Sequence, residues 1–252
     1  MAKTYGEYLH LDELLRLQEP SEHDEMLFIV VHQAYELWFK LLLHELERAR
    51  TTLSQGDLYG SIATFKRCRT VMKLLVEQVD VVETLTPMSF TSFRARLETA
   101  SGFQSLQFRE LEFLLGYKRP EMRRLYPVDG PEQKRLQQRL QEASIGDALR
   151  AFLRHQGEVV PQSEPGQANT ADPLLEEVLY RLHRTRPDLV ILFELLTDFD
   201  EGFQEWRYRH IKLVERTIGA RPGTGGSRGV EFLKQSLFQP VFPDLWNVRN
   251  RL

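Results

Sequence analysis

The hydrophobic and polar positions of this chain follow a helical period along most of its length. Over residues 22–54, apolar side chains recur every three to four positions without a proline or glycine, which predicts a helix of about eight or nine turns. The same period predicts helices over residues 58–85, 103–115, 172–184 and 187–218. Because strand-like alternation is nearly absent, we expect an all-α fold, a helical bundle with room for a cofactor in its core.

Several residues mark where these helices begin and end. Asp57 and Thr86 are suited to cap the helices that follow them, and Pro87 suits the first position of a short helix that runs through residue 96. Gly219 stands where the C-terminal cap of the last long helix is expected.

The middle of the chain, residues 117–172, carries weaker signals. Prolines and glycines interrupt it, and two amphipathic segments at 133–142 and 145–156 predict short peripheral helices. Residues 161–167 are the best candidate for a linker. Both flanking halves resemble faces of one core, so we expect a single domain.

Composition narrows the function classes. The 252 residues are 42% hydrophobic and 27% charged with a formal net charge of -3, which gives no electrostatic reason to expect nucleic acid or an anionic membrane as a partner. Cys68 is the only cysteine, which excludes an intramolecular disulfide and a thiolate metal cluster. No apolar signal core or run of roughly 18 apolar residues is evident, so we expect a cytoplasmic protein.

His32 lies in an apolar stretch of the first long helix and is the first candidate for chemistry. Five apolar residues precede it, and Phe28, Tyr35 and Phe39 share its helical face. A half-buried imidazole is well suited to accept a proton or a hydrogen bond near neutral pH. A core histidine satisfied by a neighbouring carboxylate or carbonyl explains the same pattern.

His210 occupies a comparable position near the end of the last long helix. It follows Phe199, Phe203 and Trp206 along one face. An imidazole in an aromatic and aliphatic groove suits the axial ligation of a haem, and a second, non-ligating histidine opposite would leave one iron face open for oxygen. An ordinary core histidine is the alternative.

Two further features suit a small polar ligand. Arg94 lies one helical turn after Phe90, and arginine binds carboxylates in two-point geometry. The glycine-rich loop over residues 219–227 lacks the ending of a P-loop, but its backbone N–H groups and the Thr224 hydroxyl could hold a polar group. The alternatives are that Arg94 is an ordinary surface arginine and that the glycine-rich loop is only a flexible connection.

Six motifs stand in order along the chain. They are YGEYL at 5–9, HDE at 23–25 leading into HQAYELWFK at 32–40, FTSFR at 90–94, SGFQSLQFR at 101–109, WRYRH at 206–210 and GTGGS at 223–227. Together they resemble the tryptophan 2,3-dioxygenase family over nearly the whole chain. The exception is residues 117–172, which look like a short version of a variable region, so one domain over residues 1–252 with a variable peripheral helical segment is expected.

The resemblance implies a haem-dependent dioxygenase. Such an oxidoreductase uses O2 to cleave the indole C2–C3 bond of L-tryptophan and gives N-formyl-L-kynurenine, the first step of the kynurenine pathway of tryptophan degradation. It also implies one haem b per subunit and a homotetramer.

The resemblance further implies roles around the haem. His210 is similar to the axial ligand of the iron, with Trp206 one turn away and Ser101 a polar residue near haem and substrate. His32 is similar to the histidine that accepts a hydrogen bond from the indole N–H. We favour this positioning role over that of a base, because the indole N–H is a very weak acid.

The remaining implied residues contact the substrate. Phe28 and Phe90 are similar to residues that line the indole pocket, and Arg94 to the one that pairs with the substrate carboxylate. Thr224 is similar to the residue at the substrate's amino-acid end. The N-terminal tyrosines, Tyr5 and Tyr8, resemble residues that reach into a neighbouring subunit's site.

Two other functions compete with this interpretation. One is a haem enzyme of similar fold that oxidises a modified tryptophan or another indole, although a changed substrate should alter at least one of the residues that contact it. The other is a non-catalytic helical interaction protein, for which neither haem nor tryptophan would bind.

Overall fold

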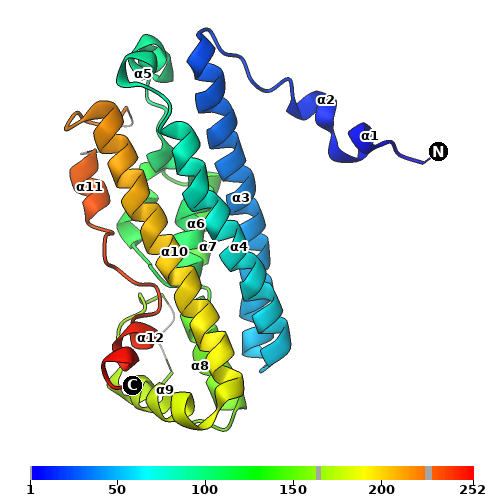
Figure 1. Ribbon diagram of the computed structural model, residues 1–252, viewed down its shortest axis with the longest axis vertical. Coiled ribbons are helices and arrows are strands. Elements are labelled where there is room, and N and C mark those ends of the chain that lie inside the picture. Colours follow the sequence, from blue (N-terminus) through cyan, green and yellow to red (C-terminus); the bar gives the residue numbers. More distant parts are fainter. Residues whose placement is uncertain (1, 163–165, 225–228) are drawn as a thin grey trace.

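Three long helices run side by side along the molecule in the computed structural model, which describes residues 2–162, 166–224 and 229–252 (Figure 1). They are α3 at His23–Ser54, α4 at Leu58–Val82 and α10 at Pro187–Ile218, and α4 packs against both of the others. No strand occurs in the described ranges. The expected all-α class is therefore confirmed.

The predicted helix ends depend on side-chain caps. The Asp57 carboxylate accepts a hydrogen bond from the Gly60 N–H at 2.9 Å, and the Thr86 hydroxyl accepts one from the Ser89 N–H at 3.1 Å. Gly219 ends α10 with a φ of 62°, a value that favours glycine. These contacts satisfy backbone groups that a helix end would otherwise leave unpaired.

Shorter helices complete the fold. Five belong to the body of the molecule: α5 at Pro87–Arg94, α6 at Leu106–Leu115, α7 at Pro131–Gln141, α8 at Ile145–His155 and α9 at Pro173–Thr185. Four helices that the sequence pattern does not predict are α1 at Tyr5–Leu9, α2 at Leu11–Leu14, α11 at Val230–Lys234 and α12 at Pro243–Asn247. Single 3-10 turns lie at Ala95–Leu97, Gly102–Gln104, Pro120–Leu125 and Val248–Asn250.

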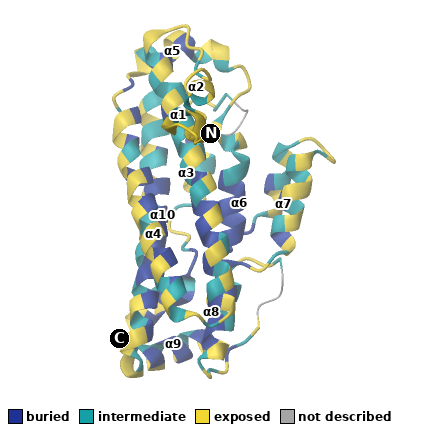
Figure 2. Cartoon of the chain, turned by 90° about the vertical axis from the view of Figure 1, so that its right-hand side faces the viewer, coloured by how far each residue is buried: buried dark blue, intermediate teal, exposed yellow. Residues whose placement is uncertain are grey.

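The main core corrects one expectation about the middle segment. The apolar face of α8 is buried, with Phe152 and Leu153 fully enclosed, and it packs against α3 as part of the main core. The prediction of a peripheral helix is therefore wrong for α8. By contrast, α7 contributes only Leu136 and Leu140 to a smaller cluster beside α6. Figure 2 shows the buried faces along α6 and α8.

One described helix, α3, is long and apolar enough to cross a membrane by length and composition alone. Its most apolar stretch has a mean hydropathy of 1.4, and 22% of that stretch is buried inside the chain. Core helices of water-soluble proteins, which are mostly buried, can have the same length and apolar composition. In this fold α3 packs against α4, α6 and α8.

Candidate functional site

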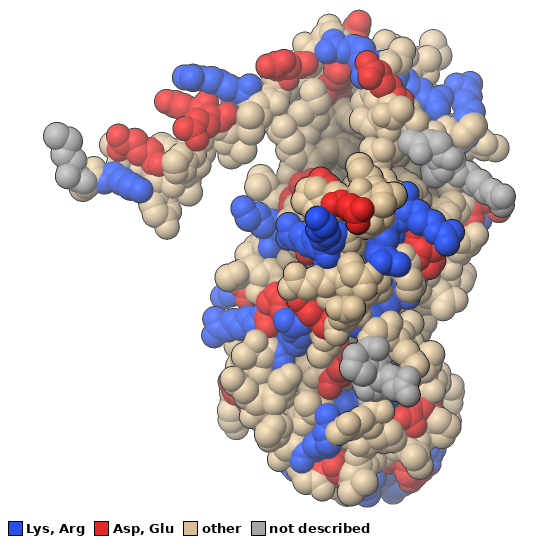
Figure 3. All heavy atoms as spheres, turned by 180° about the vertical axis from the view of Figure 1, so that it is seen from behind, with Lys and Arg blue, Asp and Glu red and all other residues tan. Residues whose placement is uncertain are grey.

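His32 projects from α3 with its tautomer fixed by the backbone. Its Nδ1 lies 2.7 Å from the Phe28 carbonyl oxygen, which can only accept, so Nδ1 carries the proton and Nε2 keeps a free lone pair. Burial lowers the pKa of His32 and outweighs the Phe28 carbonyl and Glu36, which raise it. The residue is nevertheless exposed by surface area. Both properties hold for a ring that is surrounded by other atoms but still reached by solvent. Separately, Figure 3 shows one hollow near the upper end of the molecule on the face that it draws.

His210, on α10, is the second imidazole of the candidate site. Burial, together with the charges of His32 and Arg109, lowers the pKa of His210 to about 4, so the ring is neutral at physiological pH. Trp206, on which His210 stacks, contacts Tyr35, and Tyr35 lies one helical turn after His32 on α3. Within the described ranges, no hydrogen bond reaches the His210 ring. It therefore has a lone pair available for a ligand.

An aromatic wall from three helices supports His210. Its ring stacks on Trp206 with centroids 5.1 Å apart and an interplanar angle of 4°. Trp206 in turn contacts Tyr35 and Phe39 of α3 and Phe108 of α6, at centroid distances of 6.1, 6.0 and 4.9 Å. This packing fixes the orientation of the imidazole.

A second aromatic group adjoins His32. The Phe28 ring lies 4.0 Å from the imidazole centroid, 5.8 Å from Phe90 and 5.5 Å from Phe93. Phe90 and Phe93 are 8% and 0% exposed, respectively. The structure thus brings the predicted residues Phe28, His32 and Phe90 together, from α3 and α5. It adds Phe93, which the sequence analysis did not select.

Arg94 and Thr224 connect α5 and its following segment to the glycine-rich loop. Arg94 Nη2 donates to the Pro222 carbonyl at 2.9 Å, and the Thr224 hydroxyl donates to the Ala100 carbonyl at 2.5 Å. Ser101, the next residue, accepts a hydrogen bond from the Phe103 N–H at 3.4 Å. The predicted residues Arg94, Ser101 and Thr224 therefore share one neighbourhood. The end of the loop, residues 225–228, lies outside the described ranges.

The N-terminal tyrosines do not join this site within the chain. Tyr5 and Tyr8 are 76% and 71% exposed, and α1 and α2 lie away from the bundle (Figure 1). A hydrogen bond of 2.6 Å from Gln18 to Gln33 ties the base of this arm to α3.

Arg109 is a site residue for which the sequence analysis assigned no role. It is 4% exposed, lowers the pKa of His210, and donates to the Glu112 carboxylate at 2.5 Å. Burial alone raises the pKa of Glu112, but Arg109, Arg119 and Arg207 outweigh it and hold that pKa below its usual range. Among the described residues, the Nε of Arg109 has no hydrogen-bond partner. The sequence signal that could have identified Arg109 is the position of an arginine on the apolar face of a helix.

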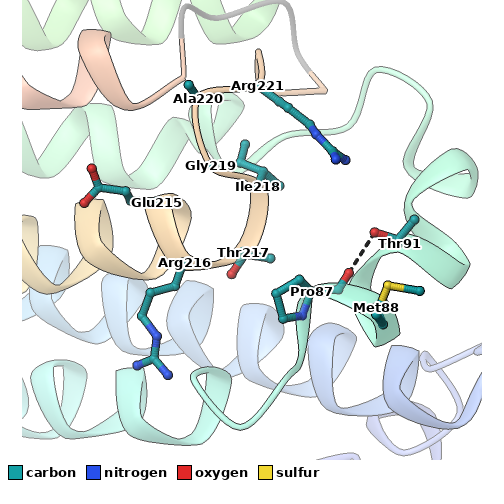
Figure 4. Close-up of a pocket in the computed structure, with 10 residues that line it drawn as sticks. All are labelled: Pro87, Met88, Thr91, Glu215, Arg216, Thr217, Ile218, Gly219, Ala220 and Arg221. Carbon is teal, nitrogen blue, oxygen red and sulfur yellow. Dashed lines mark hydrogen bonds between the residues drawn. The ribbon is translucent and has the colours of Figure 1, made fainter.

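A cavity of about 630 Å³ lies on the outer side of the same loop, between α5 and the end of α10 (Figure 4). It contains none of the predicted site residues. Two of its polar groups already have partners, since Arg216 pairs with Glu83 at 2.9 Å and the Thr91 hydroxyl donates to the Pro87 carbonyl at 2.7 Å. Because the cavity contains none of the predicted residues, we take the candidate site to be the residues around His32 and His210.

Taken together, these features define an all-helical protein with a small-molecule site between its long helices. The profile described as tryptophan 2,3-dioxygenase matches residues 1–165 and 167–252. The chain is 50% identical over 256 residues to the tryptophan 2,3-dioxygenase of Anaeromyxobacter dehalogenans (strain 2CP-C), with 100% of this chain and 97% of that protein covered.

Two further relatives carry the same name. The protein of Herpetosiphon aurantiacus is 49% identical, with 98% of each chain covered. That of Pseudomonas fluorescens is 41% identical, with 99% of this chain and 91% of the relative covered. The chain belongs to the tryptophan 2,3-dioxygenase family, which confirms the resemblance seen in its motifs.

Proposed function

We propose that this protein is a haem-dependent dioxygenase that cleaves the indole C2–C3 bond of L-tryptophan with O2 to give N-formyl-L-kynurenine. The observation that carries the proposal is the pair of neutral imidazoles, His32 and His210, which aromatic contacts between α3 and α10 connect in a chain that belongs to this family. The names of the relatives support the substrate and the reaction.

The residues around His210 fit a haem b. His210 offers a neutral imidazole with a free lone pair, held flat against Trp206. Arg109 brings a buried guanidinium with an unpartnered Nε close to His210, which suits the carboxylate side chains of a haem. In this proposal, His210 would bind the haem iron, and Trp206 and Ser101 would border the cofactor.

When bound, the haem iron supplies the oxygen chemistry that no protein side chain can perform. The chain's own residues bind and orient the substrate. Arg94 pairs with the tryptophan carboxylate, Thr224 contacts its amino-acid end, and Phe28 and Phe90 enclose the indole and exclude water. His32 Nε2 accepts the indole N–H, because the Phe28 carbonyl holds the proton on Nδ1.

The same proposal covers assembly and location. Tyr5 and Tyr8 reach a neighbouring subunit's site in a homotetramer, which their exposure of 76% and 71% supports. One domain spans residues 1–252, and the protein acts in the cytoplasm. Basic and acidic side chains are interspersed on the face in Figure 3, which supports our expectation that neither nucleic acid nor a membrane is a partner.

Product analysis tests the function. Protein loaded with haem is incubated aerobically with L-tryptophan, D-tryptophan and methylated indoles, and N-formylkynurenine is measured. We expect turnover of L-tryptophan that is lost in His32→Ala and His210→Ala. Turnover of another indole without L-tryptophan activity would favour the alternative enzyme, and no haem binding would favour an interaction protein.

A further inference from the structure

A second cavity lies at the opposite end of the bundle from the candidate site. It measures about 430 Å³ and is formed by α8, the segment that leads into α9, and residues 241–245 at the start of α12. Figure 1 places α8, α9 and α12 together at the lower end of the molecule and α5 at the upper end. The proposed dioxygenase function does not use this cavity.

Asp244 is one of three charged residues that line the cavity in the described ranges, with Arg150 and Asp172. It is 7% exposed and lies in the cavity wall. In the part of the chain that the structure describes, its carboxylate accepts one hydrogen bond, from the Asp172 N–H to Oδ1 at 2.6 Å, and forms no ion pair with a lysine or arginine. Buried carboxylates are normally paired, because the cost of desolvating the charge must be offset.

The charged neighbours do not provide the missing cation. Arg150 of α8 forms its ion pair with Asp172 at 2.9 Å, and Glu176 of α9 adds negative charge and accepts a hydrogen bond from Asn247. Burial raises the pKa of Asp244 to about 6, against the opposing effects of the Asp172 N–H and Arg150. When ionised, Arg150, Asp172 and Asp244 carry one net negative charge, and Glu176 adds to it, so the surroundings of Asp244 favour a cation.

The remaining walls combine polar and apolar side chains. Leu149, Leu175, Phe242 and Leu245 are the buried apolar side chains of the lining, and Asn169 and Thr170 are among its polar ones. No group of three or more side chains suited to a metal ion occurs in the described ranges, this cavity included. A volume of this size accommodates a small organic molecule.

We propose that this cavity binds a small organic cation, a primary amine with an apolar body. Its ammonium group pairs with Asp244, and its body packs on Leu149, Leu175 and Phe242. Nothing in this inference depends on the dioxygenase reaction, so either can fail without the other.

Calorimetric titration of the haem-loaded protein tests the charge requirement. The probes are 2-phenylethylamine, 2-phenylethanol and 3-phenylpropionate, which share a body and differ in charge. We expect the amine to bind about tenfold or more tightly than the alcohol at pH 8, where Asp244 is ionised. Equal binding of the alcohol, tighter binding of the acid, or no binding of the amine would overturn the proposal.

Variants locate the binding. Asp244→Asn keeps the shape but removes the charge, and should abolish the preference for the amine. The matched control is Asp198→Asn, because Asp198 pairs with Arg69 elsewhere on the surface and should not affect binding. Amine binding that survives Asp244→Asn would place it at another site and contradict the proposal. If Asp244→Asn does not fold, Ala168→Trp at the exposed rim should block the amine instead.

Proton release gives an independent readout. The amine stays protonated at pH 6 and pH 8, but Asp244 is partly protonated only near pH 6. Binding at pH 6 should therefore expel a proton from Asp244, and the heat should change with the ionisation enthalpy of the buffer. A buffer-independent heat at pH 6 would argue against Asp244 as the anchor.

Discussion

His32 shows how one hydrogen bond and its surroundings decide what a side chain can do. The Phe28 carbonyl fixes the proton on Nδ1, and burial lowers the pKa, so Nε2 is an acceptor near neutral pH. His210 reaches the neutral state through burial and nearby positive charge. The two histidines therefore differ in their partners rather than in charge, which suits one as an acceptor for substrate and the other as a ligand.

The pH dependence of catalysis tests the acceptor role of His32. Because its pKa is lowered from 6.5, the neutral form persists at and above pH 6.5 and is lost only at lower pH, where Nε2 gains a proton and becomes a donor. We expect kcat/KM to stay level down to about that pH and then to fall. His32→Gln, which accepts but does not titrate, should lose this acidic limb. A limb above pH 6.5 in the wild type would contradict the assignment.

Arg94→Ala tests recognition of the substrate carboxylate. The guanidinium is half-buried, and its one hydrogen bond among the described residues goes to the Pro222 carbonyl, so it can exchange that partner for a carboxylate. Removing it should cost about 2 kcal/mol of substrate-binding free energy and so raise the KM for L-tryptophan roughly thirtyfold.

The neighbouring arginine provides the matched control. Arg96 lies 3.5 Å from Glu25 and is half-exposed, so Arg96→Ala should leave KM within about threefold. An unchanged KM in Arg94→Ala, or an equal rise in both variants, would refute the role of Arg94.

At the scale of elements, helical period and caps predicted the long helices and the shorter ones from α5 to α9, but not α1, α2, α11 and α12. The ends at Asp57, Thr86 and Gly219 were predictable because the capping group is local. The burial of α8 was not, because Phe152 is buried only through packing against α3. Likewise, His32 and Phe28 share a face in the sequence, whereas the role of Arg109 beside His210 depends on how α6 and α10 meet.

Asp200 joins two parts of the fold, α10 and the C-terminal segment, and the contribution of this contact to stability can be measured. Its carboxylate accepts hydrogen bonds from the Val241 and Phe242 N–H groups and from the Trp246 indole, at 2.9 to 3.1 Å, and so holds the C-terminal segment on α10. Asp200→Ala leaves these donors unpaired and should lower the free energy of unfolding by about 3 kcal/mol in urea titrations.

A nearby carboxylate, Asp198, provides the control for a general effect of losing a negative charge. Asp198 is half-exposed and pairs with Arg69 at 2.9 Å, so Asp198→Ala should cost less than about 1 kcal/mol. Similar losses in the two variants would show that Asp200 does not hold the C-terminal segment.

At the scale of the whole molecule, the exposed apolar side chains favour an assembly of several chains. On α3, Met26, Val30 and Leu37 are 41%, 46% and 53% exposed, and the N-terminal arm adds Tyr5 and Tyr8. Large exposed apolar surfaces of this kind usually mark contacts between chains. The homotetramer that we propose would cover them.

Removing the arm tests whether neighbouring chains complete each other's sites. A chain lacking residues 1–9 should keep its helical circular dichroism, because α1 makes no contact with the core clusters, yet turn over L-tryptophan more slowly. The double variant Tyr5→Ser, Tyr8→Ser keeps the arm and should show most of the same loss. A truncated protein with full activity would rule out this role.

The absorbance spectrum of the haem-loaded protein, recorded with and without L-tryptophan, tests the central claim most directly. If His210 binds the haem iron and His32, Arg94 and Thr224 hold tryptophan beside it, the wild type should show a Soret band that shifts when L-tryptophan is added. His210→Ala should lose the wild-type band, and Arg94→Ala should keep the band but need more tryptophan for the shift. A protein without a Soret band, or a spectrum that neither His210→Ala nor L-tryptophan changes, would contradict the account.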